Sequence, residues 1–251
     1  MGGGLRAAVV LAAGIGVRLR GLPVDRPKGL LDVAGVKLIE RSLALLHTHG
    51  VERVVLVTGH RAEAYRSFLG ARFPTVEIVH NPDYARTGSM RSLHIARDRL
   101  ADDFLLLESD LLYEARAVSE LLGQPHPDCI LASGPTGQGD EVYAYGHSGR
   151  LALLSKLRLP HPPLLGEFVG ISRISVGLLT AMCAYYEAVV ADRATCEYDD
   201  CLSAASVTRP LHVHRVDGLL WGEIDDAVQY LRAIDHLVPA LRKLETHVRP
   251  P

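Results

Sequence analysis

The stretch that decides the fold is Leu11-Ala12-Ala13-Gly14-Ile15-Gly16-Val17-Arg18-Leu19, in which an apolar run enters a glycine turn that carries a cation. The run begins at Ala7 and is continuously apolar, as is typical of a parallel strand buried on both faces. Glycine lets the backbone approach a ligand closely, and turn amides can face phosphate oxygens. The stretch therefore predicts a nucleotide site at the end of a first strand.

This turn is neither of the two common phosphate-binding loops. No Gly-Lys-Ser or Gly-Lys-Thr follows it, and Leu19 stands where the third glycine of the dinucleotide fingerprint would fall. Shortly afterwards, Pro27 biases Arg26 toward an extended form and holds Lys28 on a stiff segment. Arg18 and Lys28 are suited to phosphate oxygens. Taken singly, the two motifs could also be an ordinary tight turn and a surface Pro-Lys.

Outward from the turn, short apolar runs alternate with longer amphipathic ones. We expect strands at residues 7–12, 54–57, 76–79 and 104–107, and helices at 38–49, 62–69, 89–100 and 114–122. Strands that alternate with helices predict a mainly parallel sheet with helices on both faces.

The rhythm changes after residue 128. We expect strands at 129–132, 142–145, 151–154 and 211–216, loops at 134–139 and 160–163, a helix at 176–190 and a helical end from residue 224. The prediction is an α/β fold in a single domain, residues 1–251. About 5–125 form a nucleotide-binding half, about 126–235 a mixed acceptor-binding half with a second metal carboxylate, and 236–251 a C-terminal helix and tail.

Composition excludes several functional classes. The 251 residues are 48% hydrophobic and 22% charged with a net charge of −2, so no basic field attracts nucleic acid. The chain has no apolar run long enough to span a membrane. Its four cysteines form no C-x-x-C pair, which argues against zinc and disulfides and favours a reducing cytoplasm.

Two acidic clusters are candidate metal ligands. Asp110 follows the strand at 104–107, and ligands of open α/β sheets lie at the carboxyl ends of strands. Glu223 and Asp225 are two apart in an extended segment and therefore point the same way. Mg²⁺, for which Mn²⁺ could substitute, prefers such oxygen ligands. The alternative is that both clusters cap the helices that follow them.

The glycine turn and the Arg26-Pro27-Lys28-Gly29-Leu30-Leu31 segment together resemble the signature of the nucleotidyltransferase superfamily, L-A-A-G-x-G-x-R-[LM] followed by P-K-x-[LM]. The resemblance implies a Rossmann-like three-layer fold, with Ala13 and Gly14 at the base and ribose and with Arg18 and Lys28 at the triphosphate. It also implies that Asp110 and Asp225, helped by Glu223, bind the metal. The full nucleotide set that we expect is Leu11, Ala12, Ala13, Gly14, Gly16, Arg18, Lys28, Ser89, Ser92 and Asp110.

Further segments are similar to the cytidylyltransferases that act on phosphocholine and on 2-aminoethylphosphonate. These are Asn81-Pro82-Asp83-Tyr84, Thr87-Gly88-Ser89-Met90-Arg91-Ser92-Leu93, Gly139-Asp140-Glu141-Val142-Tyr143, Leu154-Ser155-Lys156 and Gly166-Glu167-Phe168-Val169-Gly170-Ile171-Ser172-Arg173-Ile174-Ser175. Gly88 and Ser89 replace the usual asparagines, which puts base contacts at these two positions in doubt. The resemblance runs from Ala7 to about Leu231 and is slightly better to the phosphonate-activating members.

The resemblance implies transfer of CMP from CTP to a small alkylphosphonate, in phosphonate biosynthesis, by a monomer or homodimer. Arg18, Lys28 and Lys156 are the candidate catalytic residues, with Lys156 at the acceptor phosphonate. An acceptor ammonium would suit Asp140 and Glu167. A choline group would instead need rings, for which Tyr185, Tyr186, Tyr198 and Trp221 are candidates. Phosphocholine, then a sugar 1-phosphate, then a nucleotide-binding protein without turnover are the alternatives.

Overall fold

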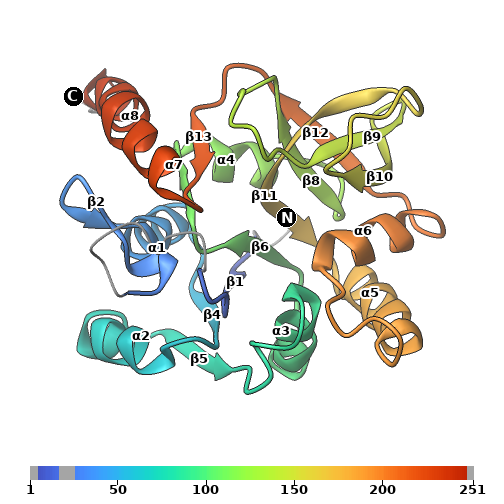
Figure 1. Ribbon diagram of the computed structural model, residues 1–251, viewed down its shortest axis with the longest axis horizontal. Helices are drawn as coiled ribbons and strands as arrows, with labels where there is room; N and C mark the ends of the chain where they lie inside the picture. Colours follow the sequence, from blue (N-terminus) through green and yellow to red (C-terminus); the bar gives the residue numbers. More distant parts are fainter. Residues whose placement is uncertain (1–4, 17–25, 248–251) are drawn as a thin grey trace.

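A nine-stranded sheet forms the centre of the molecule in the computed structural model, which describes residues 5–16 and 26–247 (Figure 1). The strand order is β5-β4-β1-β6-β11-β8-β12-β10-β9. The first four strands in this order are parallel, namely β5 (Val76–His80), β4 (Arg53–Thr58), β1 (Ala7–Ala12) and β6 (Phe104–Glu108). These four strands lie where the sequence predicts them.

Helices connect the parallel strands and cover both faces of the sheet. They are α1 (Leu38–Thr48), α2 (Ala62–Leu69) and α3 (Ser89–Ala96), with α4 (Arg116–Leu122) following β6. Apolar side chains of β1 alternate between two cores, with Val9 on one face and Val10 on the other. The three-layer α/β prediction is confirmed. The helix expected at 89–100 is shorter and continues as a 3₁₀ turn at Arg97–Arg99.

Strand β11 (Leu164–Ile174) joins the parallel part to a mixed part. It is antiparallel to β6 on one side and to β8 (Cys129–Ser133) on the other, and it also pairs with β9 (Tyr143–His147). Beyond β8 lie β12 (His212–Val216), which is parallel to β8, and β10 (Arg150–Ser155). Because β11 pairs across both parts, the two halves share one sheet.

Two elements of the mixed part were not predicted, β11 and α6 (Tyr198–Ser206). Helices α5 (Val176–Val189) and α6 pack on the same face as α3 (Figure 1). A two-stranded ribbon, β7 (Leu111–Tyr113) with β13 (Trp221–Glu223), and the hairpin β2 (Asp32–Val33) with β3 (Val36–Lys37) complete the strands.

The chain ends in a helical segment, as predicted. It comprises α7 (Ala227–Arg232), a π-helical turn (Ala233–Leu237) and α8 (Val238–His247). None of the helices within residues 5–16 and 26–247 combines the length and apolar character that a membrane crossing needs. All four cysteines are free and buried.

Candidate active site

A cavity of about 410 Å³ opens at the carboxyl ends of β1 and β6. Residues from both halves of the sheet line it. The predicted site residues that it brings together are Leu11, Ala12, Ala13, Gly14, Lys28, Ser89, Ser92, Asp110, Asp140, Lys156, Glu223 and Asp225. Gly16, which has a φ of 67°, does not line the cavity. Arg18 lies outside the described residues.

Lys28 lies between the two carboxylates that the sequence assigns to a metal. Its Nζ donates to Asp110 Oδ2 at 2.9 Å and also to Asp225 Oδ1. The Asp225 side chain is 2% exposed, so its negative charge needs such a partner. Gln229 supports the arrangement, because its Oε1 accepts from the Asp225 amide and its Nε2 donates to Asp140 Oδ1.

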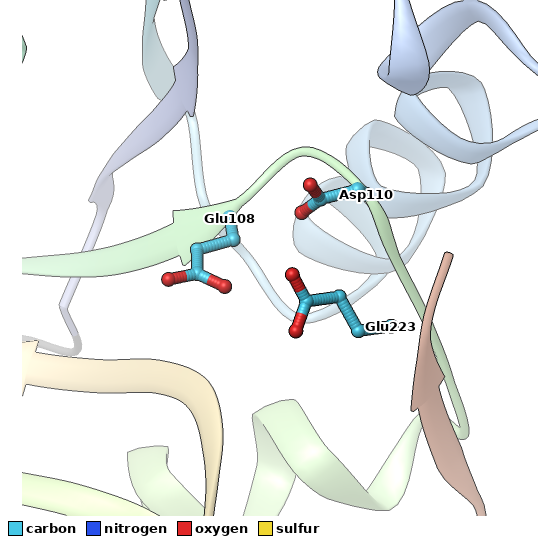
Figure 2. A group of neighbouring side chains, drawn as sticks. All are labelled: Glu108, Asp110 and Glu223. Carbon is cyan, nitrogen blue, oxygen red and sulfur yellow. The ribbon is translucent and has the colours of Figure 1, made fainter. Parts of the chain in front are cut away.

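The acidic residues form two groups that share Glu223. Glu108, Asp110 and Glu223 converge in Figure 2, and Asp140, Glu223 and Asp225 form the second group. Within each group, one carboxylate oxygen from each residue lies within 4.8 Å of one oxygen of the other two. Burial and then Asp110 raise the pKa of Glu223 to about 7, and burial and then Glu223 raise the pKa of Glu108. Carboxylates so crowded fit a hard divalent cation, which would relieve their repulsion.

The helix-capping alternative does not apply to these residues. The N-cap of α4 is Ala115, five residues after Asp110. The N-cap of α7 is Asp226, whose side chain accepts from the Gln229 amide. Glu223 and Asp225 are therefore available to the cavity, and both belong to the second acidic group, as their two-residue spacing predicts.

Glu108 is a site residue that the sequence analysis missed. Its Oε1 accepts from the Tyr198 hydroxyl at 2.7 Å, and the Tyr198 ring packs edge-on against Phe168. Gly170, with a φ of 80°, makes room for the carboxylate, since a Cβ there would lie 2.9 Å from Glu108 Oε2. Period-two spacing could have found Glu108, because it stands two residues before Asp110 at the end of β6.

The acceptor side differs from its prediction at Glu167. Lys156 and Asp140 line the cavity, but Glu167 does not. Its side chain is buried, and Oε2 accepts from the Thr136 amide and hydroxyl at 2.7 and 2.8 Å. The structure therefore ties Glu167 to the loop after β8 instead of presenting it to an acceptor.

The four aromatic rings predicted as candidates for a choline group lie in different surroundings. Tyr186 is buried in the core and Tyr185 packs against it, whereas Tyr198 and Trp221 reach the cavity lining. Tyr198 is 3% exposed and Trp221 is 8% exposed, and the Trp221 indole donates to Ser133 Oγ. Neither ring offers an open face, which a quaternary ammonium would require.

Among the residues predicted to bind the nucleotide, Ser92 accepts a hydrogen bond through Oγ from the side-chain Nδ2 of buried Asn81 at 3.1 Å. Ala13 also lines the cavity, and its carbonyl accepts from the backbone amide of His60. Ser89 also lines the cavity, but its hydroxyl is engaged with Glu197. Small side chains and backbone thus form most of this wall.

A three-layer α/β fold with a glycine turn, a lysine and converging carboxylates at the carboxyl edge of the sheet defines the class of the nucleotidyltransferases. Comparison with protein families agrees with this. Residues 8–166 match the family described as MobA-like NTP transferase domain, and the chain belongs to that family.

Two curated relatives are phosphonate enzymes. The chain is 41% identical over 130 residues to the CMP-5'-(3-aminopropyl)phosphonate synthase of Streptomyces rubellomurinus, covering 51% of this chain and 21% of the relative. It is 32% identical over 153 residues to the 2-aminoethylphosphonate cytidylyltransferase of Lancefieldella rimae, covering 59% of this chain and 60% of the relative. The matches thus span less than two thirds of either relative.

Solved structures share the fold over nearly the whole chain. The inositol-1-phosphate CTP transferase of T. maritima has a TM-score of 0.82 at 20% identity and covers 99% of both chains. The CTP:phosphocholine cytidylyltransferase of Streptococcus pneumoniae has a TM-score of 0.72 at 19% identity, covering 98% of this chain and 100% of its own.

Proposed function

We propose that this protein is a cytidylyltransferase that transfers CMP from CTP to a small alkylphosphonate such as 2-aminoethylphosphonate and releases pyrophosphate. The observation that carries the proposal is the junction of the two halves, where Lys28 pairs with Asp110 from one half and Asp225 from the other in a single cavity. The names of the two phosphonate relatives support the choice of acceptor.

In the proposed reaction, a phosphonate oxygen of the acceptor attacks the α-phosphorus of CTP. A new P–O bond forms as the bond to pyrophosphate breaks, and the negative charge passes to the leaving pyrophosphate. The acceptor oxygen is already a nucleophile, so catalysis consists of positioning and charge neutralisation. No covalent intermediate with the protein is needed.

Each side of the cavity has a role in this scheme. Ala13, Gly14 and Ser92 would bind the nucleoside, Lys28 the triphosphate and Lys156 the acceptor phosphonate. Asp110, Glu223 and Asp225 would hold Mg²⁺, which supplies charge neutralisation on the phosphates when bound. In this scheme Lys28, which pairs with Asp110 and Asp225 in the structure, would instead donate to phosphate oxygens of the bound triphosphate.

An ammonium head group suits the acceptor side better than choline does. A primary ammonium donates three hydrogen bonds and is met by carboxylates, which Asp140 and Asp199 offer in the cavity lining. A trimethylammonium donates none, and the nearby rings of Tyr198 and Trp221 are buried. A hydroxyalkylphosphonate would also suit these carboxylates, because its hydroxyl can donate to them.

The test is pyrophosphate release from CTP and Mg²⁺ with a panel of acceptors. 2-Aminoethylphosphonate and 3-aminopropylphosphonate should give the highest kcat/KM, followed by 2-hydroxyethylphosphonate, with phosphocholine and glucose 1-phosphate far lower. Equal use of ATP or GTP would contradict the cytidylyltransferase assignment, preferred use of phosphocholine would contradict the acceptor, and no release with any acceptor would favour a nucleotide-binding protein.

A further inference from the structure

Gly88 and Ser89 join two elements that are distant in the sequence. Three hydrogen bonds donated by the backbone amides of residues 88–90 link this segment to residues 194–197. The Gly88 amide donates to Ala194 O at 3.2 Å, the Met90 amide to Cys196 O at 3.4 Å and the Ser89 amide to Glu197 Oε2 at 2.7 Å. The start of α3 is thereby fixed to the segment that leads into α6.

The Ser89 hydroxyl strengthens this junction both as a hydrogen-bond donor and as an acceptor. It donates to Glu197 Oε2 and accepts from the Tyr198 amide at 2.9 Å. Glu197 is also the N-cap of α6 and forms a capping box with Asp200. The Ser89 donor is therefore already used within the protein, which leaves little for a nucleotide base.

Gly88 is required for space and not for its backbone angle. Its φ of −81° is open to any residue. A Cβ at this position would, however, lie 2.3 Å from Cys196 O and 2.7 Å from Thr195 O. The side chain of an asparagine could enter only if the segment before α6 moved away from α3.

This junction determines where the first turn of α6 lies. Glu197, Tyr198 and Asp199 are the residues of this turn that line the cavity. Tyr198 in turn donates to Glu108, and Asp199 brings a carboxylate to the acceptor side. A shift of α6 would widen this wall while leaving Ala13, Gly14 and Lys28 in place.

We propose that Gly88 and Ser89 are positioning residues that fasten the first turn of α6 to the nucleotide-binding half and so set the acceptor wall of the cavity. The inference rests on the proposed function, because it assigns that wall to the acceptor head group. It gives Gly88 and Ser89 a role in acceptor selection, not in reading the base.

The test compares Ser89→Ala and Gly88→Ala with two matched controls. Ser119→Ala removes an exposed hydroxyl from α4, and Gly123→Ala adds a Cβ whose nearest neighbour is 3.4 Å away. Ser89→Ala should lower kcat/KM for 2-aminoethylphosphonate by about 5-fold and change the KM for CTP by less than about 2-fold. Gly88→Ala should lower this kcat/KM further. Ser89→Thr, which keeps the hydroxyl, should have a kcat/KM close to the wild-type value, and so should both controls.

Hydrogen exchange without substrates provides the second readout. Amides of residues 196–201 should exchange faster in Ser89→Ala and Gly88→Ala than in either control. A higher KM for CTP with unchanged exchange would make Ser89 a nucleotide ligand and overturn the inference. Failure of the wild type to use CTP would refute the proposed function instead, and unchanged exchange at 196–201 would still refute the junction.

Discussion

The two walls of the cavity are built in different ways. In the proposed assignment, the nucleotide wall consists largely of backbone and small side chains from two short segments, the end of β1 with Ala12, Ala13 and Gly14 and the first turn of α3 with Ser89 and Ser92. The acceptor wall consists of charged and aromatic side chains from several elements, among them Glu108 on β6, Tyr198 on α6 and Glu223 on β13. The nucleotide wall therefore depends mainly on short stretches of local sequence, and the acceptor wall depends on elements that the fold brings together from distant parts of the chain.

This difference suggests how the work of recognition is divided. Backbone atoms keep their chemistry when side chains change, so the first wall suits a nucleotide that many related enzymes share. Side-chain carboxylates and lysines can be exchanged singly, so the second wall suits an acceptor that varies. The walls meet at Lys28, between Asp110 and Asp225, and there we expect changes to cost most.

Asp110→Ala and Asp225→Ala test that meeting point. Each change removes a proposed metal ligand, and turnover should fall by roughly 10²–10³-fold if the ligand contributes as much as a lost oxyanion donor. Steady-state pyrophosphate release with saturating CTP and Mg²⁺ measures the effect. Near-normal turnover in both variants would exclude the metal assignment.

Asp226→Ala is the matched control for Asp225→Ala. Asp226 is the neighbouring carboxylate, but it caps α7 and does not line the cavity. Its loss should lower the free energy of unfolding by about 1 kcal/mol and leave turnover close to that of the wild type. Equal losses of turnover at 225 and 226 would point to general damage of this segment.

Lys156→Ala should separate the two walls. Lys156 lines the cavity, and the proposal gives it the acceptor phosphonate, so removal of its charge should lower kcat/KM for 2-aminoethylphosphonate by roughly 10–100-fold, as expected for a lost charge-assisted bond. The KM for CTP should stay near the wild-type value. Lys243→Ala, which changes an exposed residue of α8 outside the cavity lining, is the control. A matching rise in the KM for CTP would mean that Lys156 binds the triphosphate.

The same contrast explains what the sequence could predict. Strands β1, β4, β5 and β6 are short apolar runs between helices, so local pattern was enough. Strand β11 carries Gly166 and Gly170 within its eleven residues, and its partners β6, β8 and β9 lie far away in the sequence. Helix α6 was missed although the two carboxylates in its first turn are a common helix-start signal.

Site residues followed the same division. Gly14, Lys28 and Asp110, which line the cavity, could be predicted because they follow a strand or a proline within a few residues. Glu167 was misplaced because nothing local tells a carboxylate that faces a cavity from one that binds a loop. Only the pairing of β11 with β8, which sets Glu167 opposite Ser133, decides that question.

Glu167→Ala tests whether Glu167 stabilises the loop after β8 and not the acceptor. Glu167 is buried and accepts two hydrogen bonds from Thr136, so its removal leaves those donors without their partner. The free energy of unfolding should fall by about 1–3 kcal/mol, while kcat/KM for the acceptor changes little. Urea unfolding and acceptor kinetics measure the two effects. A variant of wild-type stability that loses the acceptor would restore Glu167 to the acceptor site.

Asp199→Asn tests the acceptor wall through the smallest effect that we expect, a change in the pH dependence of stability. Burial, followed by the charges of Asp200 and Glu197, raises the pKa of Asp199 from 3.8 to about 6. Between these values the folded protein binds more protons than the unfolded chain, so ionisation of Asp199 costs the native state stability as the pH rises. Asparagine avoids that cost. Relative to the wild type, the variant should therefore gain on the order of 1 kcal/mol in free energy of unfolding between pH 4.5 and pH 7.5. Urea unfolding at the two pH values measures this gain. A variant that instead loses relative stability as the pH rises would show that the Asp199 carboxylate is held by a cation of the protein, and it would no longer be available to an acceptor ammonium.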